Sequence, residues 1–317
     1  MWVYGESRDG QPTPVTLELV SQASASGDAT VVFLGAGAAG AAAVAGEYGA
    51  AHALVDENPV YDQYLALPAV DALASLVAAR QPDLLLFATT YDSRDVASRL
   101  AARLGCGVVS NATGIEAVDG GYRVLTPWGS ETVAVCEVTG GGTAIVLARP
   151  KAFTATHTGG SCAVEQFTGQ PGAGAQAVQI VETVEEVAEG PSLADAKVVV
   201  SGGRGLGKPE NFTLIEELAD LLGGATGATR AVVDAGWRPY AEQVGQTGVT
   251  VKPDVYLAWG ISGAIQHLAG MKNAKAIVAV NRDPDAPLLR NADLGVVGDA
   301  LKILPQLIDE VKRRRNG

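Results

Sequence analysis

The sequence predicts an α/β protein of two domains, each a mainly parallel sheet flanked by helices. The chain has 317 residues, which exceeds one typical domain. Short apolar runs alternate with helical patterns in both halves, a pattern typical of a parallel sheet covered on both faces. An acidic run at residues 185–191 separates the halves and is predicted to be a linker. We therefore expect one domain over residues 1–190 and a second, doubly wound domain over residues 191–317.

The composition argues against several classes of protein. The net charge is −12 and aromatic residues make up 5%, which argues against a nucleic-acid surface. Cys106, Cys136 and Cys162 share no CxxC spacing and are odd in number, so we expect reduced thiols rather than disulfides or metal ligands. We find no leader-like segment and no apolar run of membrane-spanning length, so a cytoplasmic protein without membrane insertion is expected.

The first domain is predicted to alternate strands and helices up to about residue 109. A change of pattern after residue 122 indicates an antiparallel set, because the apolar runs there are joined by short polar or glycine-rich turns. A further strand is expected near the linker, at residues 178–184. The predicted strands are residues 2–4, 30–34, 52–55, 84–88 and 107–109, the helices are 15–25, 39–48, 68–80 and 93–104, and the antiparallel set is 122–126, 132–136 and 143–147.

A GxGxxG motif at residues 35–40 follows a strand and opens a helix, with Asp56 at the end of the next strand. That context fits a dinucleotide fingerprint. The alternative is that glycine and alanine only let the helix pack closely on the sheet. We favour packing, because this strand is not the first of its unit and chance matches are common in a chain so rich in glycine and alanine.

The second domain is organised around residues 254–288. A buried strand at 255–259 is followed by a turn and by a helix predicted from Ser262, its N-cap, to about Met271, and then by a strand at 276–280. The mouth of such a helix suits a phosphate. His267 lies about 7 Å further along a helical axis. One long ligand, with a phosphate at one end and a polar group at the other, could therefore reach both.

Two loops in this domain carry arginines beside small residues. Arg204 lies in a glycine-rich loop after a strand, where it supplies a fixed positive charge for a phosphate or is simply a surface arginine. Arg230 ends a glycine- and alanine-rich strand, where it reaches solvent or meets an anion.

Further polar groups follow the predicted strands. The loop at residues 243–248 is dense in donors and acceptors, so it either reads a flat heterocycle or is an ordinary polar turn. Asn281 and Asp299 follow the strands 276–280 and 294–297, at the carboxyl ends where ligands bind, although each could equally be a cap or turn residue. No nucleophile–base pair, metal-ligand cluster or carboxylate dyad is found. This donor set is typical of a cradle for a cofactor that does the chemistry itself.

Six motifs together resemble the alpha subunit of electron-transfer flavoprotein, the FixB-like family. They cover essentially the whole C-terminal half and follow the family's order: SGGRG (201–205), GATR (227–230), QVGQTG (243–248), GISGAIQHLAGM (260–271), AVNRDPDAPL (279–288) and ADLGVVGD (292–299). The N-terminal half is similar more loosely, through ESRDG near the start, TPVTLEL (13–19) and LAARLGCGVVSNATGIE (100–116).

The resemblance implies an electron carrier rather than a substrate-converting enzyme. The family's alpha subunit pairs with a beta subunit and holds one FAD in its C-terminal domain, while AMP sits in the beta subunit. The heterodimer takes electrons from acyl-CoA or other dehydrogenases and commonly passes them to a membrane quinone reductase. The alternatives are a flavin-bifurcating relative that oxidises NADH with a second FAD in beta, and a module that keeps the fold without flavin.

The resemblance also implies roles for single residues. Arg230 would lie over the flavin and favour its reduced, anionic forms, Thr247 would bond near N5, and His267 would reach O2. Ser262 and Arg204 would bind the pyrophosphate. Asn281 and Asp299 would bind the adenosine. The full set of expected cofactor contacts is Arg204, Thr229, Arg230, Gln243, Gly245, Gln246, Thr247, Gly260, Ser262, Gly263, Gln266, His267, Asn281 and Asp299.

The chain departs from the family's pattern at three single residues and over residues 126–150, where the sequence diverges and no role is carried over. Thr229 stands where serine is usual and keeps the hydroxyl, and Arg282 replaces a common lysine and keeps the charge. Trp259 is bulkier than the usual residue and is expected to narrow access to the site.

Overall fold

The computed structural model describes residues 1–128, 132–139, 141–183 and 191–315. The chain forms two compact units, Met1–Val184 and Glu185–Gly317. The acidic run that we predicted to be the linker falls almost entirely on residues 184–190, outside the described residues. The predicted boundary at 190 is therefore not tested and stays a prediction.

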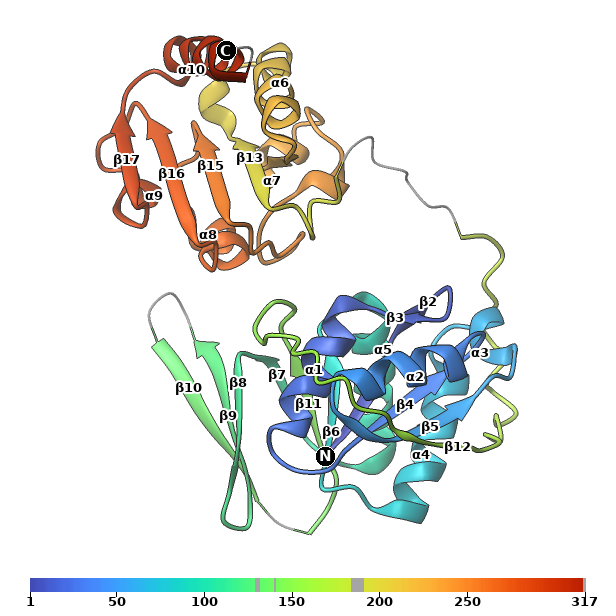
Figure 1. The fold of residues 1–317 in the computed structure, drawn as a ribbon. Helices are drawn as coiled ribbons and strands as arrows, with labels where there is room; N and C mark the ends of the chain where they lie inside the picture. The colour runs from blue at the N-terminus through green and yellow to red at the C-terminus, as the bar shows by residue number, and fades with distance from the viewer. Residues whose placement is uncertain (129–131, 140, 184–190, 316–317) are drawn as a thin grey trace. The chain divides into compact units, whose positions relative to one another are not determined.

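The N-terminal unit is built on a seven-stranded sheet whose pairings are all parallel (Figure 1). Its strands in spatial order are β12 (Ala163–Gln166), β5 (Ala50–Asp56), β4 (Ala29–Leu34), β1 (Trp2–Gly5), β6 (Leu84–Ala88), β11 (Ala144–Ala148) and β7 (Val108–Ala112). Strand β6 reads LLLFA and is buried at every position. Such a continuous apolar run is expected where helices cover both faces of a sheet.

Helices cover both faces of this sheet. Residues of α1 (Pro14–Ser24) and α2 (Ala38–Glu47) join one apolar cluster, and residues of α4 (Leu67–Arg80) and α5 (Tyr91–Leu104) join the other. Thr13 caps α1 ahead of a proline at its first turn, as the helix start requires. Short elements complete the unit: β2 (Ser7–Arg8), β3 (Gln11–Pro12) and α3 (Val60–Gln63). The predicted strands and helices before residue 110 are confirmed, with ends that differ by a few residues.

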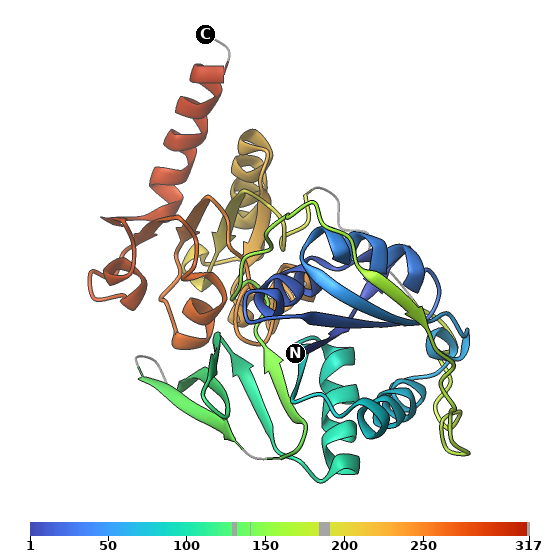
Figure 2. The ribbon, with the colours of Figure 1, turned by 60° about the horizontal axis from the view of Figure 1, so that its bottom comes forward.

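The predicted antiparallel set is wrong at its last member. The antiparallel sheet consists of β8 (Gly114–Val118), β9 (Gly121–Trp128) and β10 (Thr132–Thr139), drawn together in Figure 2. The run at 143–147 instead becomes β11, between β6 and β7 of the parallel sheet. Its composition explains the difference, because AIVLA is apolar on both faces whereas β10 alternates between more and less exposed positions.

The strand predicted near the linker is also wrong over the residues that can be checked. Residues 178–183 contain only an isolated bridge, between Gln179 and Tyr64. Residue 184 lies outside the described part of the chain. One bridge does not make a strand, because a strand needs consecutive hydrogen-bonded pairs with a neighbour. Val181 in this run is 94% exposed.

The GxGxxG motif packs the unit together, as the composition suggested. A Cβ atom on Gly37 would lie 2.7 Å from the backbone of Gly10, and one on Gly40 would lie 3.2 Å from the carbonyl oxygen of the same residue. The carboxylate of Asp56 accepts hydrogen bonds from the Tyr61 hydroxyl at 2.7 Å and the Gly169 amide at 2.8 Å. These groups serve the fold of the unit itself.

The C-terminal unit is a five-stranded parallel sheet. Its spatial order is β14 (Ala225–Ala228), β13 (Val198–Gly202), β15 (Val255–Trp259), β16 (Ala276–Asn281) and β17 (Leu294–Val297). The chain moves from β13 to one side and then returns to the other, which is the doubly wound order. The direction therefore switches between β13 and β15, the place where such sheets bind ligands.

The faces of this sheet are covered unequally. Residues of α6 (Thr213–Leu222) and α10 (Ala300–Arg315) pack on one face, and residues of α8 (Ile265–Met271) and α9 (Pro287–Arg290) on the other. Short helical turns lie in the connections between strands and helices. They are η1 (Arg204–Leu206) and η2 (Pro209–Phe212) between β13 and α6, and α7 (Arg230–Val233) and η3 (Tyr240–Glu242) between β14 and β15. Among the helices that the structure describes, none is long and apolar enough to cross a membrane.

Candidate functional site: a cavity at the switch point of the C-terminal sheet

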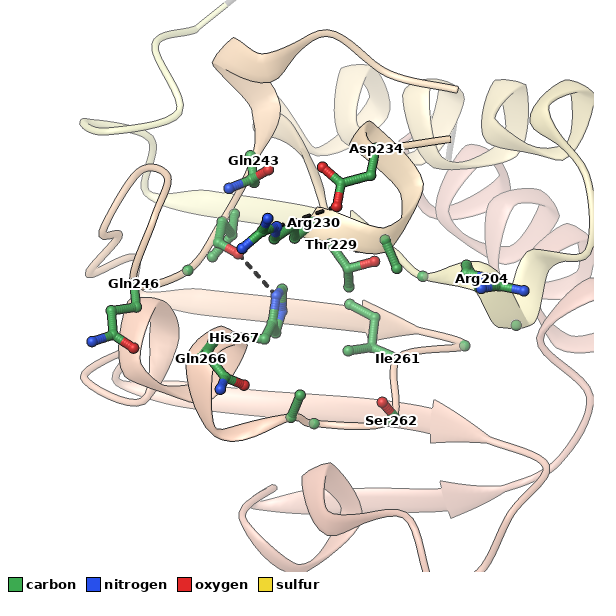
Figure 3. A pocket seen from close by; sticks show the side chains of 18 of the residues that line it. Arg204, Thr229, Arg230, Asp234, Gln243, Gln246, Ile261, Ser262, Gln266 and His267 are labelled. Atoms are coloured by element: carbon green, nitrogen blue, oxygen red, sulfur yellow. Dashed lines mark hydrogen bonds and ion pairs between the residues drawn. The ribbon is translucent and has the colours of Figure 1, made fainter. Parts of the chain in front are cut away.

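A cavity of about 620 Å³ opens at the carboxyl ends of four strands of the C-terminal sheet (Figure 3). Its walls are the segments that follow β13, β14, β15 and β16, together with the loop at 243–247 and the first residues of α8. Small-molecule sites are typically concave and of this size. The topology of the sheet therefore places the cavity where a ligand is expected.

Glycines let the cavity loops approach one another closely. A Cβ on Gly203 would lie 2.4 Å from the carbonyl oxygen of Gly260, and one on Gly205 would lie 2.6 Å from its Cα. Gly260 and Gly263 have positive φ angles of 63° and 89°, which disfavour other residues. Larger residues would separate the β13 and β15 loops. The glycine-rich motifs thus shape this end of the cavity.

Four charged residues line the cavity, two of each sign. They are Arg204, Arg230, Asp234 and Asp283. Arg230 Nε donates to Asp234 Oδ2 at 3.2 Å, and both side chains are more than half exposed. An exposed pair of this kind is weak. The guanidinium of Arg230 can therefore exchange its carboxylate for an anionic ligand at little cost.

The loop at 243–247 directs a hydroxyl donor. Gln243 is buried and its Nε2 donates to Thr247 Oγ1 at 3.0 Å, while the hydroxyl of Tyr240 donates to the carbonyl oxygen of Thr247. Because Oγ1 accepts from the amide, the hydroxyl proton of Thr247 must point elsewhere. Both Gln243 and Thr247 line the cavity, so this proton is available to a ligand.

His267 lies in the cavity wall but is 5% exposed. Its Nδ1 lies 3.0 Å from the carbonyl oxygen of Val244, the contact marked by a dashed line in Figure 3. Its Nε2 lies 3.0 Å from the hydroxyl of Tyr256, which in turn lies 2.7 Å from Ser201 Oγ. Burial lowers the pKa of His267 to about 4. The ring is therefore neutral at physiological pH.

All but one of the residues predicted to contact a cofactor line this single cavity. Those that do are Arg204, Thr229, Arg230, Gln243, Gly245, Gln246, Thr247, Gly260, Ser262, Gly263, Gln266, His267 and Asn281.

Asp299 is not among the lining residues. Its carboxylate accepts from Arg282 at 2.7 Å and from the Leu301 amide at 3.0 Å, at the start of α10. The pKa of Asp299 is lowered, chiefly by the hydrogen bond from Arg282. The structure thus gives Asp299 the cap role that the sequence left open.

The helix predicted from Ser262 begins three residues later. Helix α8 runs over Ile265–Met271, and Ala264 at its N-cap position makes no side-chain cap. Ser262 lies instead in the loop, where its carbonyl oxygen accepts from the Leu288 amide at 3.1 Å. The positive φ of Gly263 explains the late start, because a left-handed residue interrupts a helix. Ser262 still lines the cavity, but it does not cap a helix.

Two further expectations can be compared with the structure. Trp259 is 2% exposed, packs in the core beneath α6 and α10, and is not a lining residue, so the expected narrowing of access by Trp259 is wrong. The described residues contain no group of three or more His, Cys, Asp or Glu that could hold a metal ion.

Several relevant residues were not singled out from the sequence. Asp234 lies four residues after Arg230, so helical spacing could have paired them. Tyr256 sits inside an apolar strand run and gives no comparable signal, and Ser201 opens the SGGRG motif without a predicted role of its own.

Comparison with known proteins agrees with these observations. Residues 192–272 match the family model described as the electron transfer flavoprotein FAD-binding domain, and residues 1–185 match the electron transfer flavoprotein domain. The chain is 40% identical over 317 residues to the electron transfer flavoprotein subunit alpha of Mycobacterium leprae, covering 99% of this chain and 98% of the relative. It is also 40% identical over 320 residues to that of Syntrophomonas wolfei, covering 98% and 99%.

A third relative carries a different name. The chain is 36% identical over 321 residues to Protein FixB of Clostridium saccharobutylicum, covering 98% of this chain and 96% of the relative. The matches extend over both units, so the similarity is not confined to the cavity. The chain therefore belongs to the electron transfer flavoprotein alpha subunit family.

Proposed function

We propose that this chain is the alpha subunit of an electron transfer flavoprotein and holds one FAD in the cavity of its C-terminal unit. The observation that carries the proposal is the convergence of thirteen predicted contacts on one cavity at the switch point of a doubly wound sheet. The match of residues 192–272 to a FAD-binding domain model supports it.

The donor set fits a dinucleotide. One end of the cavity has the glycine loops with Arg204 and Ser262, which offer backbone amides, a hydroxyl and a positive charge to a pyrophosphate. The other end has Thr247, which offers a hydroxyl donor, and Arg230, which offers a positive charge to a flat polar ring, with the ring of His267 in the same wall. We place Asn281 toward the adenosine, although its Nδ2 already donates to the Ile261 carbonyl oxygen at 2.7 Å.

Bound FAD supplies reversible one- and two-electron chemistry. The chain's own residues would bind FAD and set how readily its ring takes up negative charge on reduction. Arg230 would supply a positive charge to the ring, and Thr247 would donate the hydroxyl proton that its hydrogen bond from Gln243 leaves available. His267 presents a neutral, hydrogen-bonded ring. No described group in the cavity acts as a nucleophile with a neighbouring base, so an electron carrier fits better than a substrate-converting enzyme.

The partners follow from the family. We propose a heterodimer with a beta subunit, through which the protein accepts electrons from acyl-CoA or other dehydrogenases and delivers them to a quinone reductase. AMP, a bound nucleotide of the family, is proposed for the beta subunit. The cytoplasmic location stays a prediction.

The test is a spectrum of the protein co-expressed with a beta subunit encoded in the same genome. We expect a visible flavin spectrum and, after heat release, FAD rather than FMN. A colourless preparation after gentle purification would contradict the proposal. Adding NADH to the same sample tests the bifurcating alternative, which requires direct bleaching of the flavin without a dehydrogenase.

A further inference from the structure

Two buried hydroxyls stand behind His267 and take no part in lining the cavity. Tyr256 and Ser201 are both 0% exposed, on the neighbouring strands β15 and β13. With His267 they form a chain of polar atoms that leads from the cavity wall into the sheet, with steps of 3.0 Å and 2.7 Å. Three polar side chains in an apolar core are costly unless each is satisfied.

The proton positions in this chain follow from the acceptors. The carbonyl oxygen of Val244 can only accept, so Nδ1 of His267 carries a hydrogen. The structure has the Tyr256 hydroxyl donating to Ser201 Oγ at 2.7 Å. In the neutral ring, the same hydroxyl proton can turn instead to Nε2, which is then an acceptor at 3.0 Å. In a protonated ring, Nε2 donates to the oxygen of Tyr256, whose proton turns to Ser201 Oγ. The two states differ by one added proton and by the direction of the Tyr256 hydroxyl, which points to Nε2 in the neutral state and to Ser201 Oγ in the protonated state.

The packing around Ser201 keeps room for this hydroxyl. Gly227 of β14 lies opposite Ser201 in the register, and a Cβ on Gly227 would lie 2.2 Å from Ser201 Oγ. Alanine at that position would therefore displace the last member of the chain. An apolar pair at positions 201 and 256 would fill the same core without any such demand.

We propose that Tyr256, backed by Ser201, is a positioning residue that lets His267 take up a proton when the ligand in the cavity gains a negative charge. This inference rests on the proposed function, since the ligand in question is FAD. The electron comes from the donor protein, and the proton comes from solvent and binds Nε2, the ring nitrogen that faces Tyr256. No bond other than this N–H bond forms.

The surroundings of His267 favour coupling to the ligand's charge. The charged groups that line the cavity are Arg204, Arg230, Asp234 and Asp283, equal in number of each sign, so their charges largely offset one another. Burial keeps the ring neutral while the cavity holds no added charge. A negative charge on the bound ring then provides the attraction that makes protonation favourable.

The experiment compares variants of the FAD-loaded protein with its beta partner. We measure the potential of the first electron by spectral titration at several values between roughly pH 6 and 8. Tyr256→Phe keeps the core volume but removes the acceptor of the charged Nε2–H bond, which is stronger than the neutral bond. We expect the reduced form to be favoured about tenfold less, a fall of about 59 mV in a one-electron potential, and a flatter dependence on pH.

Ser201→Ala removes the acceptor that Tyr256 needs in the charged state while leaving the contact between Tyr256 and His267. We expect a smaller fall in the same direction. Trp259→Phe is the matched control: it lies on the same strand, its Nε1 is buried without a hydrogen-bond partner, and it packs on the opposite face. It should leave the potential and its pH dependence unchanged.

Nitrogen NMR of His267 gives a readout that loss of stability alone would not move. In the oxidised wild type we expect the Nδ1–H tautomer with a hydrogen-bonded Nε2, and in Tyr256→Phe a free Nε2. The inference is overturned if Tyr256→Phe and Ser201→Ala show the potential, pH slope and nitrogen shifts of Trp259→Phe. If Tyr256→Phe does not fold, Ser201→Ala decides by the same comparison. A protein that binds no FAD refutes the proposed function instead.

Discussion

The charges of Arg230 and Asp234 act on the same region of the cavity with opposite sign. Both side chains line it, and they pair at 3.2 Å. Arg230→Ala should lower the flavin potential, because a positive charge that favours a reduced, anionic ring is lost. With both side chains largely exposed, we expect a change of ~1 kcal/mol, which corresponds to about 40 mV for one electron. Spectral redox titration measures it.

Substitution of Asp234, the partner of Arg230, should shift the flavin potential in the opposite direction. Asp234→Asn should raise the potential by a similar amount, since it frees Arg230 and removes a negative charge. Arg290→Ala is the control, because Arg290 pairs with Asp285 at 3.6 Å and lines no part of the cavity. Equal shifts in the three variants would show that the protein's overall charge, rather than this pair, sets the potential.

His267 should also make stability depend on pH. Its pKa is about 4 when folded, against an unfolded value near 6.5, because burial penalises the charged ring. The unfolded state therefore binds more protons between these values, so the contribution is complete above about pH 6.5 and is lost as the pH falls toward 4. The full difference is about 3 kcal/mol by this linkage.

Unfolding of the flavin-free protein in urea, at about pH 5 and about pH 7.5, measures this effect. His267→Gln cannot titrate, so its stability should change less between the two conditions than that of the wild type. The same pH dependence in both proteins would mean that His267 is charged or exposed in the folded state.

At the scale of elements, the pairing of β13 with β14 depends on a glycine. Gly227→Ala would bring a methyl group to 2.2 Å from Ser201 Oγ and 3.1 Å from Val244 Cγ2. We expect a loss of roughly 1–3 kcal/mol, as for other overpacked cores. A urea midpoint measures it. Gly107→Ala is the control, because nothing lies within 4 Å of its added Cβ, and it should change the midpoint little.

The sequence predicted most elements because apolar periodicity is a local property. Strand β15 is found at the predicted residues, and β6 likewise. The errors arise where the outcome depends on distant residues. The choice of β11 between two sheets is made by β6 and β7, and the late start of α8 by one left-handed glycine.

At the scale of the whole molecule, the sheet order of the C-terminal unit explains why distant motifs meet. Loops after β13, β14, β15 and β16 come from residues spread over most of the unit, yet parallel strands bring their carboxyl ends to one edge. The sequence could place the site residues because they lie in short motifs after strands, in one polar loop and on the helix that follows β15. It could not show that Tyr256 pairs with Ser201, since a polar group within an apolar run becomes informative only once its partner is known.

The most direct test of the proposed function is whether FAD binds in this cavity. FAD is titrated into flavin-stripped protein, wild type and Ser262→Trp, and binding is followed by flavin fluorescence. Ser262 is an exposed lining residue, so tryptophan there should obstruct the cavity without disturbing the core. We predict one FAD per chain for the wild type and binding weakened at least about a hundredfold in the variant, or ~3 kcal/mol. Equal affinity in the two proteins would contradict the account, because the cofactor would then lie outside this cavity.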